Sequence, residues 1–371
     1  MAVEVMPFLH GFRRIVYEQE DGESVSGALA DLLDRESQSP VFTEGISYSL
    51  FRVAHLGLVS AAEVLLRYGA DLNFEDPVSY YNPLHIAVLR NKPDMVRMLI
   101  SQGADIEKRD RTALLHALAS SDGLTVDNVD NIQLLLERGA DVNACSQDGE
   151  TPMSSLTFLV KEALDSSVRG AKKIGHFCIR VAHLLLRHGG DANQGELWEQ
   201  SLIYTSLENF DLLFPLTALL LQHRACFLCS QSTTYWTGQE LIFTRLAQVL
   251  QEASHAQETA DVLNKAEVLL DLALIYSPVF PPLFPRSQLE LVSTNRPLLE
   301  LYGKLEEQER SPLSLKCLCK RLIIQCLKPW PFEEKLRALP LPDRLKDLLL
   351  PEKSWRSRAG WDRVVPRRSA H

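Results

Sequence analysis

Apolar positions along the chain recur in a pattern that predicts pairs of short helices. Five apolar stretches end in a Leu-Leu-like pair, two polar residues and then Gly-Ala-Asp or a close variant. These segments are 65–73, 99–107, 135–143, 185–193 and, with Arg224 in place of the glycine, 220–228. Glycine readily takes the left-handed backbone conformation at a helix end, and Asp and Asn close tight turns. Each segment is therefore expected to end a helix and to begin a hairpin.

The spacing of these turns indicates a repeat protein. Turn positions 69, 103, 139, 189 and 224 lie 34, 36, 50 and 35 residues apart. A period near 33 residues, with two helices and a hairpin per unit, is typical of ankyrin repeats. The segment Asn82-Pro83-Leu84-His85-Ile86-Ala87 also resembles the ankyrin helix start Thr-Pro-Leu-His-x-Ala, so His85 is interpreted as structural rather than catalytic. The expected fold class is all-α, an ankyrin-repeat solenoid.

The pattern also suggests where the solenoid begins and ends. About six repeats, some degenerate, are expected over residues 28–276, after an N-terminal extension of residues 1–27. Residues 277–310 are expected to form a linker, with four prolines between positions 278 and 285, and then a helix. Residues 311–350 are expected to form a separate small domain. Residues 351–371 are expected to be a disordered basic tail.

Three irregularities interrupt the repeats. The hairpin around residues 108–111 is about three residues short and is expected to be distorted. Residues 120–131 and 160–175 are insertions of about six and about seventeen residues relative to a regular repeat. Such insertions usually form loops on one face of a solenoid, so both are expected to be loops. Loops often carry recognition, but tolerated surface variation is the simpler interpretation of both insertions.

A helix with an apolar stripe is expected near the C-terminus. The stripe follows the i, i+3, i+4, i+7 spacing of one helix face. It contains Leu315, Leu318, Cys319, Leu322 and Ile323. Cys319 behaves here as a small apolar residue between larger ones. Such a stripe could cap the repeats or could receive a partner.

A second motif, Leu339-Pro340-Leu341-Pro342, lies 24 residues further on. Each proline fixes its own φ and favours an extended residue before it, so an extended strip presenting Leu339 and Leu341 is expected. A short helix with Leu345, Leu348 and Leu349 on one side should follow. Together with the earlier prolines, these breaks divide the region into about three short helices.

The ordered pair of motifs resembles the SOCS box of the ankyrin-repeat and SOCS-box family. This resemblance covers residues 311–350, and with the repeats nearly all of 28–350. It implies that Leu315, Leu318, Cys319, Leu322 and Ile323 bind elongin C, which carries elongin B. It also implies that cullin-5, with its RING-box protein, binds Leu339, Pro340, Leu341, Pro342, Leu345 and Leu348. Family patterns usually have an aromatic residue where this chain has Leu348.

Charge and cysteine content narrow the function classes. The net charge is −9, but residues 1–310 alone carry 25 basic and 42 acidic side chains, which argues against nucleic acid and mildly favours a basic protein partner. No apolar run approaches the roughly 18 residues of a membrane span. Seven irregularly spaced cysteines are typical of a reducing compartment. We therefore expect a cytoplasmic protein with no membrane segment, metal or cofactor.

The function expected is that of a non-catalytic substrate receptor of a ubiquitin ligase. The repeats would bind an unidentified protein, and the C-terminal domain would recruit the ligase. The alternative is an ankyrin scaffold whose C-terminal helices only cap the repeats. An enzyme with a thiol nucleophile at Cys226 or Cys229 is a further class. The Cys226-x-x-Cys229 spacing resembles half a zinc site, but a second such pair is absent from the sequence.

Overall fold

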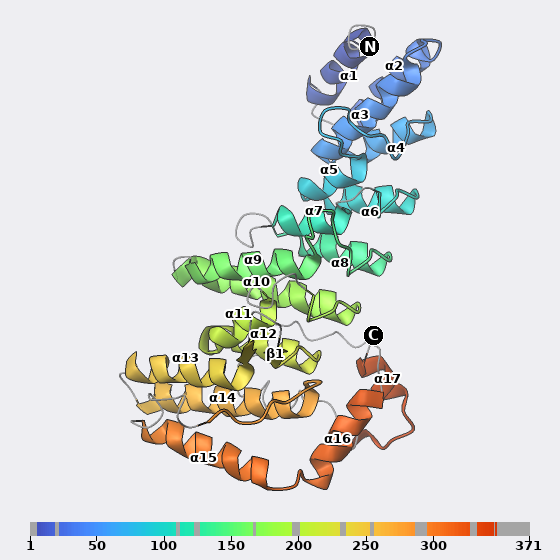
Figure 1. Ribbon diagram of the computed structural model, residues 1–371. Coiled ribbons are helices and arrows are strands. Elements are labelled where there is room, and N and C mark those ends of the chain that lie inside the picture. The colour runs from blue at the N-terminus through green and yellow to red at the C-terminus, as the bar shows by residue number, and fades with distance from the viewer. Residues whose placement is uncertain are drawn as a thin grey trace. The chain divides into compact units, whose positions relative to one another are not determined.

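The computed structural model describes ten ranges and one further residue of the chain. They are 6–18, 22–108, 112–121, 127–165, 168–194, 201–230, 235–252, 256–285, 295–326, 332–344 and 346. The chain forms two compact units, residues 1–150 and 151–371. Each unit is a stack of helices (Figure 1).

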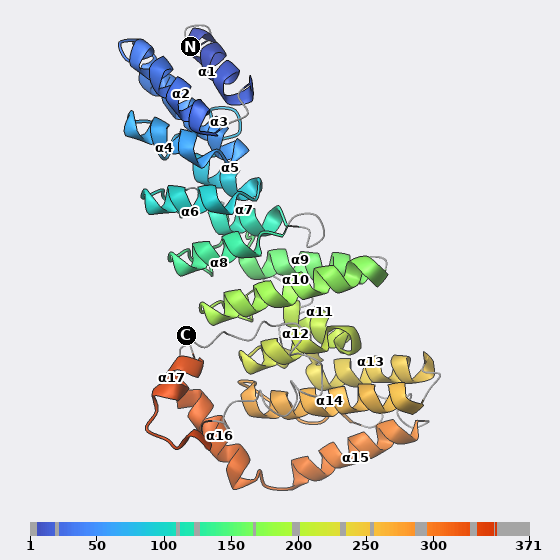
Figure 2. The same cartoon turned by 180° about the vertical axis from the view of Figure 1, so that it is seen from behind.

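The first unit consists of four antiparallel helix pairs within its described ranges. They are α1 (Met6–Glu18), α2 (Gly22–Glu36), α3 (Phe42–Leu56), α4 (Val59–Arg67), α5 (Pro83–Leu89), α6 (Pro93–Ser101), α7 (Ala113–Ala119) and α8 (Val129–Glu137). Odd-numbered helices pack against one another in one layer, and even-numbered helices form the second layer (Figures 1 and 2). The boundary expected at residues 27 and 28 falls inside α2, and α1 lies ahead of it.

The second unit has a two-layer pattern of its own. It contains α9 (Pro152–Asp165), α10 (Val168–Arg187), α11 (Leu202–Glu208), α12 (Phe210–Gln222), β1 (Leu228–Ser230), β2 (Tyr235–Thr237), α13 (Gly238–Glu252), α14 (Ala256–Tyr276), α15 (Arg296–Arg310), α16 (Leu315–Cys326) and α17 (Phe332–Ala338). α9, α11, α13 and α15 form one layer, whereas α10, α12, α14 and α16 form the other. The two strands pair antiparallel, with Cys229 opposite Trp236. The all-α prediction is confirmed, with one short hairpin added.

The turns that end the helix pairs are built as the sequence predicts. Gly69 has a φ of 90°, its N–H donates to the Leu66 carbonyl, and the Ala70 N–H donates to the Leu65 carbonyl. The same pair of hydrogen bonds recurs at 103, 139, 189 and 224. Arg224 has a φ of 67°, so it takes the left-handed conformation that glycine takes elsewhere. These bonds satisfy carbonyls that the helix leaves without a partner.

His223, just before Arg224, makes the second unit sensitive to acid. The residue is half-buried and its Nδ1 is out of contact with water. Burial, and then the nearby His183, lowers the pKa of His223 from 6.5 to about 3. The neutral ring therefore stabilises the fold above pH 6.5, and this stabilisation is lost as the pH falls toward 3.

We expect the unfolding free energy to fall by roughly 1–2 kcal/mol between pH 7.5 and pH 5 because of this histidine. His223→Gln should remove that part of the pH dependence. Urea denaturation of both chains at the two pH values measures it. Equal pH dependence in the two chains would contradict the assignment.

The longer insertion is helical on both sides of residues 166–167, which lie outside the described residues, and this corrects the expectation of a loop at 160–175. α9 has 14 residues and α10 has 20, whereas α5 and α6 have 7 and 9. The added turns pack on each other and bury Val160, Ala163 and Ile174. Seven of residues 160–175 are Lys, Glu, Ala or Leu, which favour helices. An amphipathic hairpin of helices therefore forms in place of an irregular loop.

The other two irregularities lie partly outside the described residues, which omit 109–111 and 122–126. After the second gap, Asn128 is buried and its Nδ2 donates to the Ala117 carbonyl and to Ser120 Oγ. Asn131 Nδ2 donates to Asn128 Oδ1 and to Asn91 Oδ1. Hydrogen bonds thus fix the C-terminal end of this insertion to the neighbouring helices.

The proline-bearing segment 277–285 is irregular in conformation but packed. Phe280 stacks on Phe227 with ring centroids 5.6 Å apart. Phe284 is buried, and its carbonyl accepts a hydrogen bond of 2.6 Å from the Tyr302 hydroxyl. The segment therefore ties α15 to the repeats. α15 itself starts at Arg296, with Pro297 in its first turn, so this proline begins the helix and does not interrupt it.

Candidate protein-docking surfaces

The C-terminal helix α16 has a defined start. Ser314 Oγ accepts a hydrogen bond from the Cys317 N–H at 3.2 Å, and the Ser314 carbonyl accepts from the Leu318 N–H at 3.0 Å. Serine is among the preferred helix caps because its side chain satisfies an N–H that lacks a partner in the first turn. The cap fixes which side chains of α16 lie on each face.

The apolar stripe expected on α16 faces solvent. Leu315, Leu318 and Leu322 are 76%, 48% and 61% exposed. Cys319 is also exposed, and Ile323 is half-buried. We call these five residues the docking ridge. Leucines on a monomeric fold are normally buried, and several exposed ones on one helix face indicate a contact surface.

The opposite face of α16 attaches the helix to the protein. Ile324 is 3% exposed, and α16 packs against α14. In α17, Leu336 is fully buried. Sequence reasoning assigned Ile323 to the stripe and overlooked these two anchors. The sequence did contain a signal for both. Ile324 is a second apolar residue directly after Ile323, and Leu336 is the single leucine within residues 332–338.

The second motif has a different backbone from the expected one. The Leu341 N–H donates to the Leu339 carbonyl at 2.8 Å, which closes a tight turn around Pro340 in place of an extended strip. The φ that proline imposes also fits an inverse γ-turn, so proline favours both conformations. The Lys346 N–H then donates to the Pro342 carbonyl. This bond marks the start of the short helix expected there.

The side chains of this motif are only partly accessible. Pro340 and Pro342 are exposed, whereas Leu339 and Leu341 are half-buried. Lys346 Nζ donates to the Arg337 carbonyl at 2.8 Å, which ties the turn back to α17. Leu345 and Leu348, the other two residues expected to contact a cullin, lie outside the described residues.

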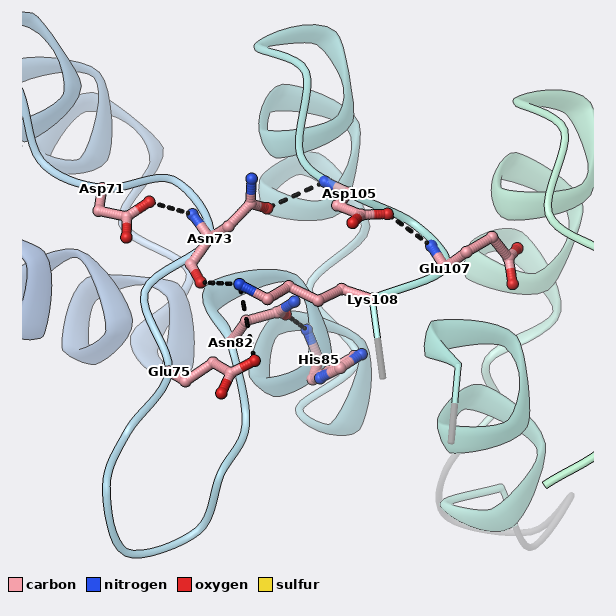
Figure 3. Close-up of polar contacts among 8 residues, drawn as sticks. All are labelled: Asp71, Asn73, Glu75, Asn82, His85, Asp105, Glu107 and Lys108. Carbon is pink, nitrogen blue, oxygen red and sulfur yellow. Dashed lines mark hydrogen bonds and ion pairs between the residues drawn. The ribbon is translucent and has the colours of Figure 1, made fainter. Parts of the chain in front are cut away.

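A row of polar contacts links successive repeats of the first unit (Figure 3). The Asp71 and Asp105 carboxylates each accept a hydrogen bond from a backbone N–H two residues later. Asn73 Oδ1 then accepts from the Asp105 N–H at 3.0 Å, one repeat further on. Glu107 Oε1 accepts from the Asp141 N–H at 2.9 Å in the same way. The acidic and amide side chains therefore fix the repeats in register, besides closing their own turns.

Sequence reasoning predicted that Asp and Asn side chains close the turn within each repeat. It missed the hydrogen bonds that these side chains make to the next repeat. The separations of 32 and 34 residues between partners match the repeat period and were the available signal. Lys108 adds to the row, since its Nζ donates to the Asn73 carbonyl at 2.8 Å and lies 3.6 Å from the Glu75 carboxylate.

His85 is part of the packing between α5 and α7. It is 1% exposed, and its N–H donates to Asn82 Oδ1 at 2.7 Å, which caps α5. Its ring lies 4.9 Å from that of His116, and Tyr81 packs against both rings. Such a buried cluster fits the structural interpretation made from the sequence.

The two cysteines considered as nucleophiles lie in unsuitable surroundings. Cys229 is 2% exposed. Burial, and then the Asp191 carboxylate, raises the pKa of the Cys226 thiol. A reactive cysteine requires the opposite, an accessible thiol with a lowered pKa. The geometry at this turn therefore does not favour nucleophilic chemistry.

Within the ranges given above, no helix is both long enough and apolar enough to cross a bilayer. In the same part of the chain, no group of three or more His, Cys, Asp or Glu side chains is arranged to hold a metal ion.

Known sequence families match both parts of the chain. A family of ankyrin repeats, in three copies, matches residues 50–153, and the SOCS box family matches residues 311–350. The stacked helix pairs and the solvent-facing ridge thus belong to a repeat protein with a C-terminal SOCS box.

Full-length relatives narrow this class further. The chain is 39% identical over 421 aligned residues to ankyrin repeat and SOCS box protein 6 of Homo sapiens, covering 94% of this chain and 98% of the relative. The protein of the same name from Mus musculus is 39% identical over 420 residues, covering 93% and 98%. The chain belongs to the ankyrin repeat and SOCS box family. This membership supports a role as a substrate-recognition adaptor.

Proposed function

We propose that the chain is the substrate-recognition subunit of a ubiquitin ligase built on cullin-5, its RING-box protein and elongin B–elongin C. The observation that carries this proposal is the docking ridge. Three leucines face water on α16, while Ile324 on its other face is buried and the helix packs against α14. A helix with one face anchored and one apolar face exposed is suited to receive another protein's helix or groove.

In this proposal elongin C covers Leu315, Leu318, Cys319, Leu322 and Ile323. Cullin-5 contacts the segment of Leu339, Pro340, Leu341 and Pro342, with Leu345 and Leu348 beyond it. The repeats hold the target protein, so that its lysines lie near the ubiquitin-charged enzyme brought by the RING-box protein. The chain then contributes proximity and orientation and no covalent chemistry. We place this activity in the cytoplasm.

Charges on the docking ridge should abolish recruitment of the adaptor. With Leu315→Asp and Cys319→Asp together, we expect elongin B–elongin C to bind at least about tenfold more weakly, because the contact would bury unpaired carboxylates. Both positions are exposed in the chain, so folding should persist. Calorimetric titration of purified elongin B–elongin C into the full chain measures the change, and cullin-5 capture is read in parallel.

The matched control is Leu212→Asp. Leu212 is 65% exposed and lies on α12, outside the SOCS box. This variant should bind elongin B–elongin C as the unchanged chain does. If the ridge variant also binds with unchanged affinity, the chain is an ankyrin scaffold with a helical cap, which is the alternative function.

A further inference from the structure

The hairpin between α4 and α5 presents two apolar side chains to solvent. Its tip consists of Pro77, Val78, Ser79 and Tyr80, all exposed. Val78 is 85% exposed and Tyr80 is 59% exposed. We call residues 77–80 the finger tip. In Figure 3 the loop that carries it projects from Glu75 and Asn82 away from the row of polar contacts.

Hydrogen bonds hold the finger tip in one conformation. Asp76, itself 9% exposed, accepts from the Ser79 N–H and from the Ser79 hydroxyl at 2.8 and 2.7 Å. The Tyr80 N–H donates to the Asp76 carbonyl at 2.7 Å, and the Asp76 N–H donates to the Tyr81 carbonyl at 3.0 Å. A preorganised loop loses little conformational freedom when a partner binds. The exposure of Val78 and Tyr80 is therefore built into the loop.

Tyr80 occupies a position where another hairpin of the same unit has a glycine. In the hairpin 144–151, the Ser146 N–H donates to the Glu150 carbonyl, and Gly149 between them has a φ of 77°. The finger tip is one residue longer, and Tyr80 takes the left-handed place with a φ of 60°. A bulky residue in this conformation is strained. Glycine would adopt this conformation without strain.

Charge indicates the kind of partner. Residues 1–150 contain 12 Lys or Arg and 24 Asp or Glu. Among the described hairpin residues of this unit, the exposed carboxylates are those of Asp71, Asp105, Glu107, Asp141 and Asp148. The described lysine of this row, Lys108, is engaged by Asn73 and Glu75. A unit with this excess of acidic side chains and an exposed apolar contact favours a segment with positive charge.

We propose that the finger tip anchors a target segment in which an apolar side chain is flanked by lysines or arginines. Tyr80 and Val78 contact the apolar side chain, and the exposed carboxylates at the hairpin bases attract the basic ones. Tyrosine is among the residues that contribute most to protein–protein contacts. The inference rests on the proposed function only in naming this segment as part of the ubiquitination target; its binding to the chain is separate from ligase recruitment.

Three fluorescein-labelled synthetic peptides of about 12 residues test the proposal. One has a Leu-Phe centre flanked by lysines and arginines, the second replaces Leu-Phe by Ser-Ser, and the third replaces the basic residues by glutamate. Fluorescence anisotropy with the full chain, without any ligase component, should show the first binding at least about tenfold more tightly than the other two. Equal binding of the first two peptides, or no binding of the first, overturns the proposal.

Variants of the finger tip separate recognition from folding. Val78→Ser with Tyr80→Gly should weaken binding of the first peptide at least about tenfold, while the melting temperature stays the same or rises because the strain is relieved. Phe158→Ser, at an aromatic residue of α9 that is 64% exposed, is the matched control and should bind normally. Unchanged peptide binding by the finger-tip variant overturns the proposal. Because docking-ridge variants should still bind the peptide, the two proposals fail independently.

Discussion

Gly238→Ala is expected to destabilise residues 151–371 by about 3 kcal/mol or more. Gly238 is the first residue of α13, and its N–H donates to the Phe227 carbonyl at 2.9 Å. A Cβ at this position would lie 2.2 Å from Phe227 Cε2 and 2.6 Å from Cζ. Phe227 is fully buried and stacks on Phe280, so any movement of its ring would disturb this packing.

A double-mutant cycle identifies the ring as the cause. Phe227→Ala alone should cost about 3–5 kcal/mol, because it leaves a cavity in the core. In that background, Gly238→Ala should cost less than about 1 kcal/mol, since the atoms it would meet are gone. Urea denaturation followed by circular dichroism gives the free energies of unfolding. Additive effects of the two substitutions would show that the helix start, and not the contact with Phe227, requires glycine.

The repeats could be predicted because their turns depend on local chemistry. Gly69 and Gly139 take a backbone conformation that few other residues adopt, so they mark helix ends in the sequence itself. The spacing of these turns was sufficient to place a helix end at Arg224, although an arginine alone predicts no turn. Four turns of known geometry and a regular period were sufficient to identify the fold.

The structure of the inserted residues could not be predicted from their number. Counting residues between Gly139 and Gly189 shows that about seventeen are added but not whether they extend existing helices. That outcome depends on whether the added turns of α9 and α10 can bury apolar side chains against each other, which is a tertiary effect. The same limit applies at Pro340, where the local rules allow both a turn and an extended strip.

The docking ridge was predictable as a stripe but not as a surface. Spacing places Leu315, Leu318 and Leu322 on one helix face, yet the same spacing describes a face packed on the repeats. Only the contact of Ile324 with the interior shows which side is turned to the protein. The sequence contained even less indication of the finger tip. Pro77-Val78-Ser79-Tyr80 is an ordinary loop sequence, and the left-handed Tyr80 became apparent only in three dimensions.

Phe243→Ala is expected to cost about 3–5 kcal/mol and to loosen the connection to the SOCS box. Phe243 on α13 is fully buried. Its ring lies 5.4 Å from that of Phe284 and 6.1 Å from that of Tyr302 on α15. These three rings join the repeats, the proline-bearing segment and the helix that leads to α16. Truncation removes one of the three rings, so amide hydrogen exchange in α15 should rise together with the loss of stability.

Tyr302→Phe is the matched control for this cluster. It keeps the ring, which lies 5.5 Å from that of Phe284, and removes only the hydroxyl that donates to the Phe284 carbonyl. One such hydrogen bond contributes about 1 kcal/mol, and the carbonyl left behind accounts for up to a further 1–2 kcal/mol. A smaller effect than that of Phe243→Ala would show that ring packing, more than the hydrogen bond, holds α15 in place. A cost below about 1 kcal/mol for Phe243→Ala, with unchanged exchange in α15, would mean that the segment 277–285 is a linker after all.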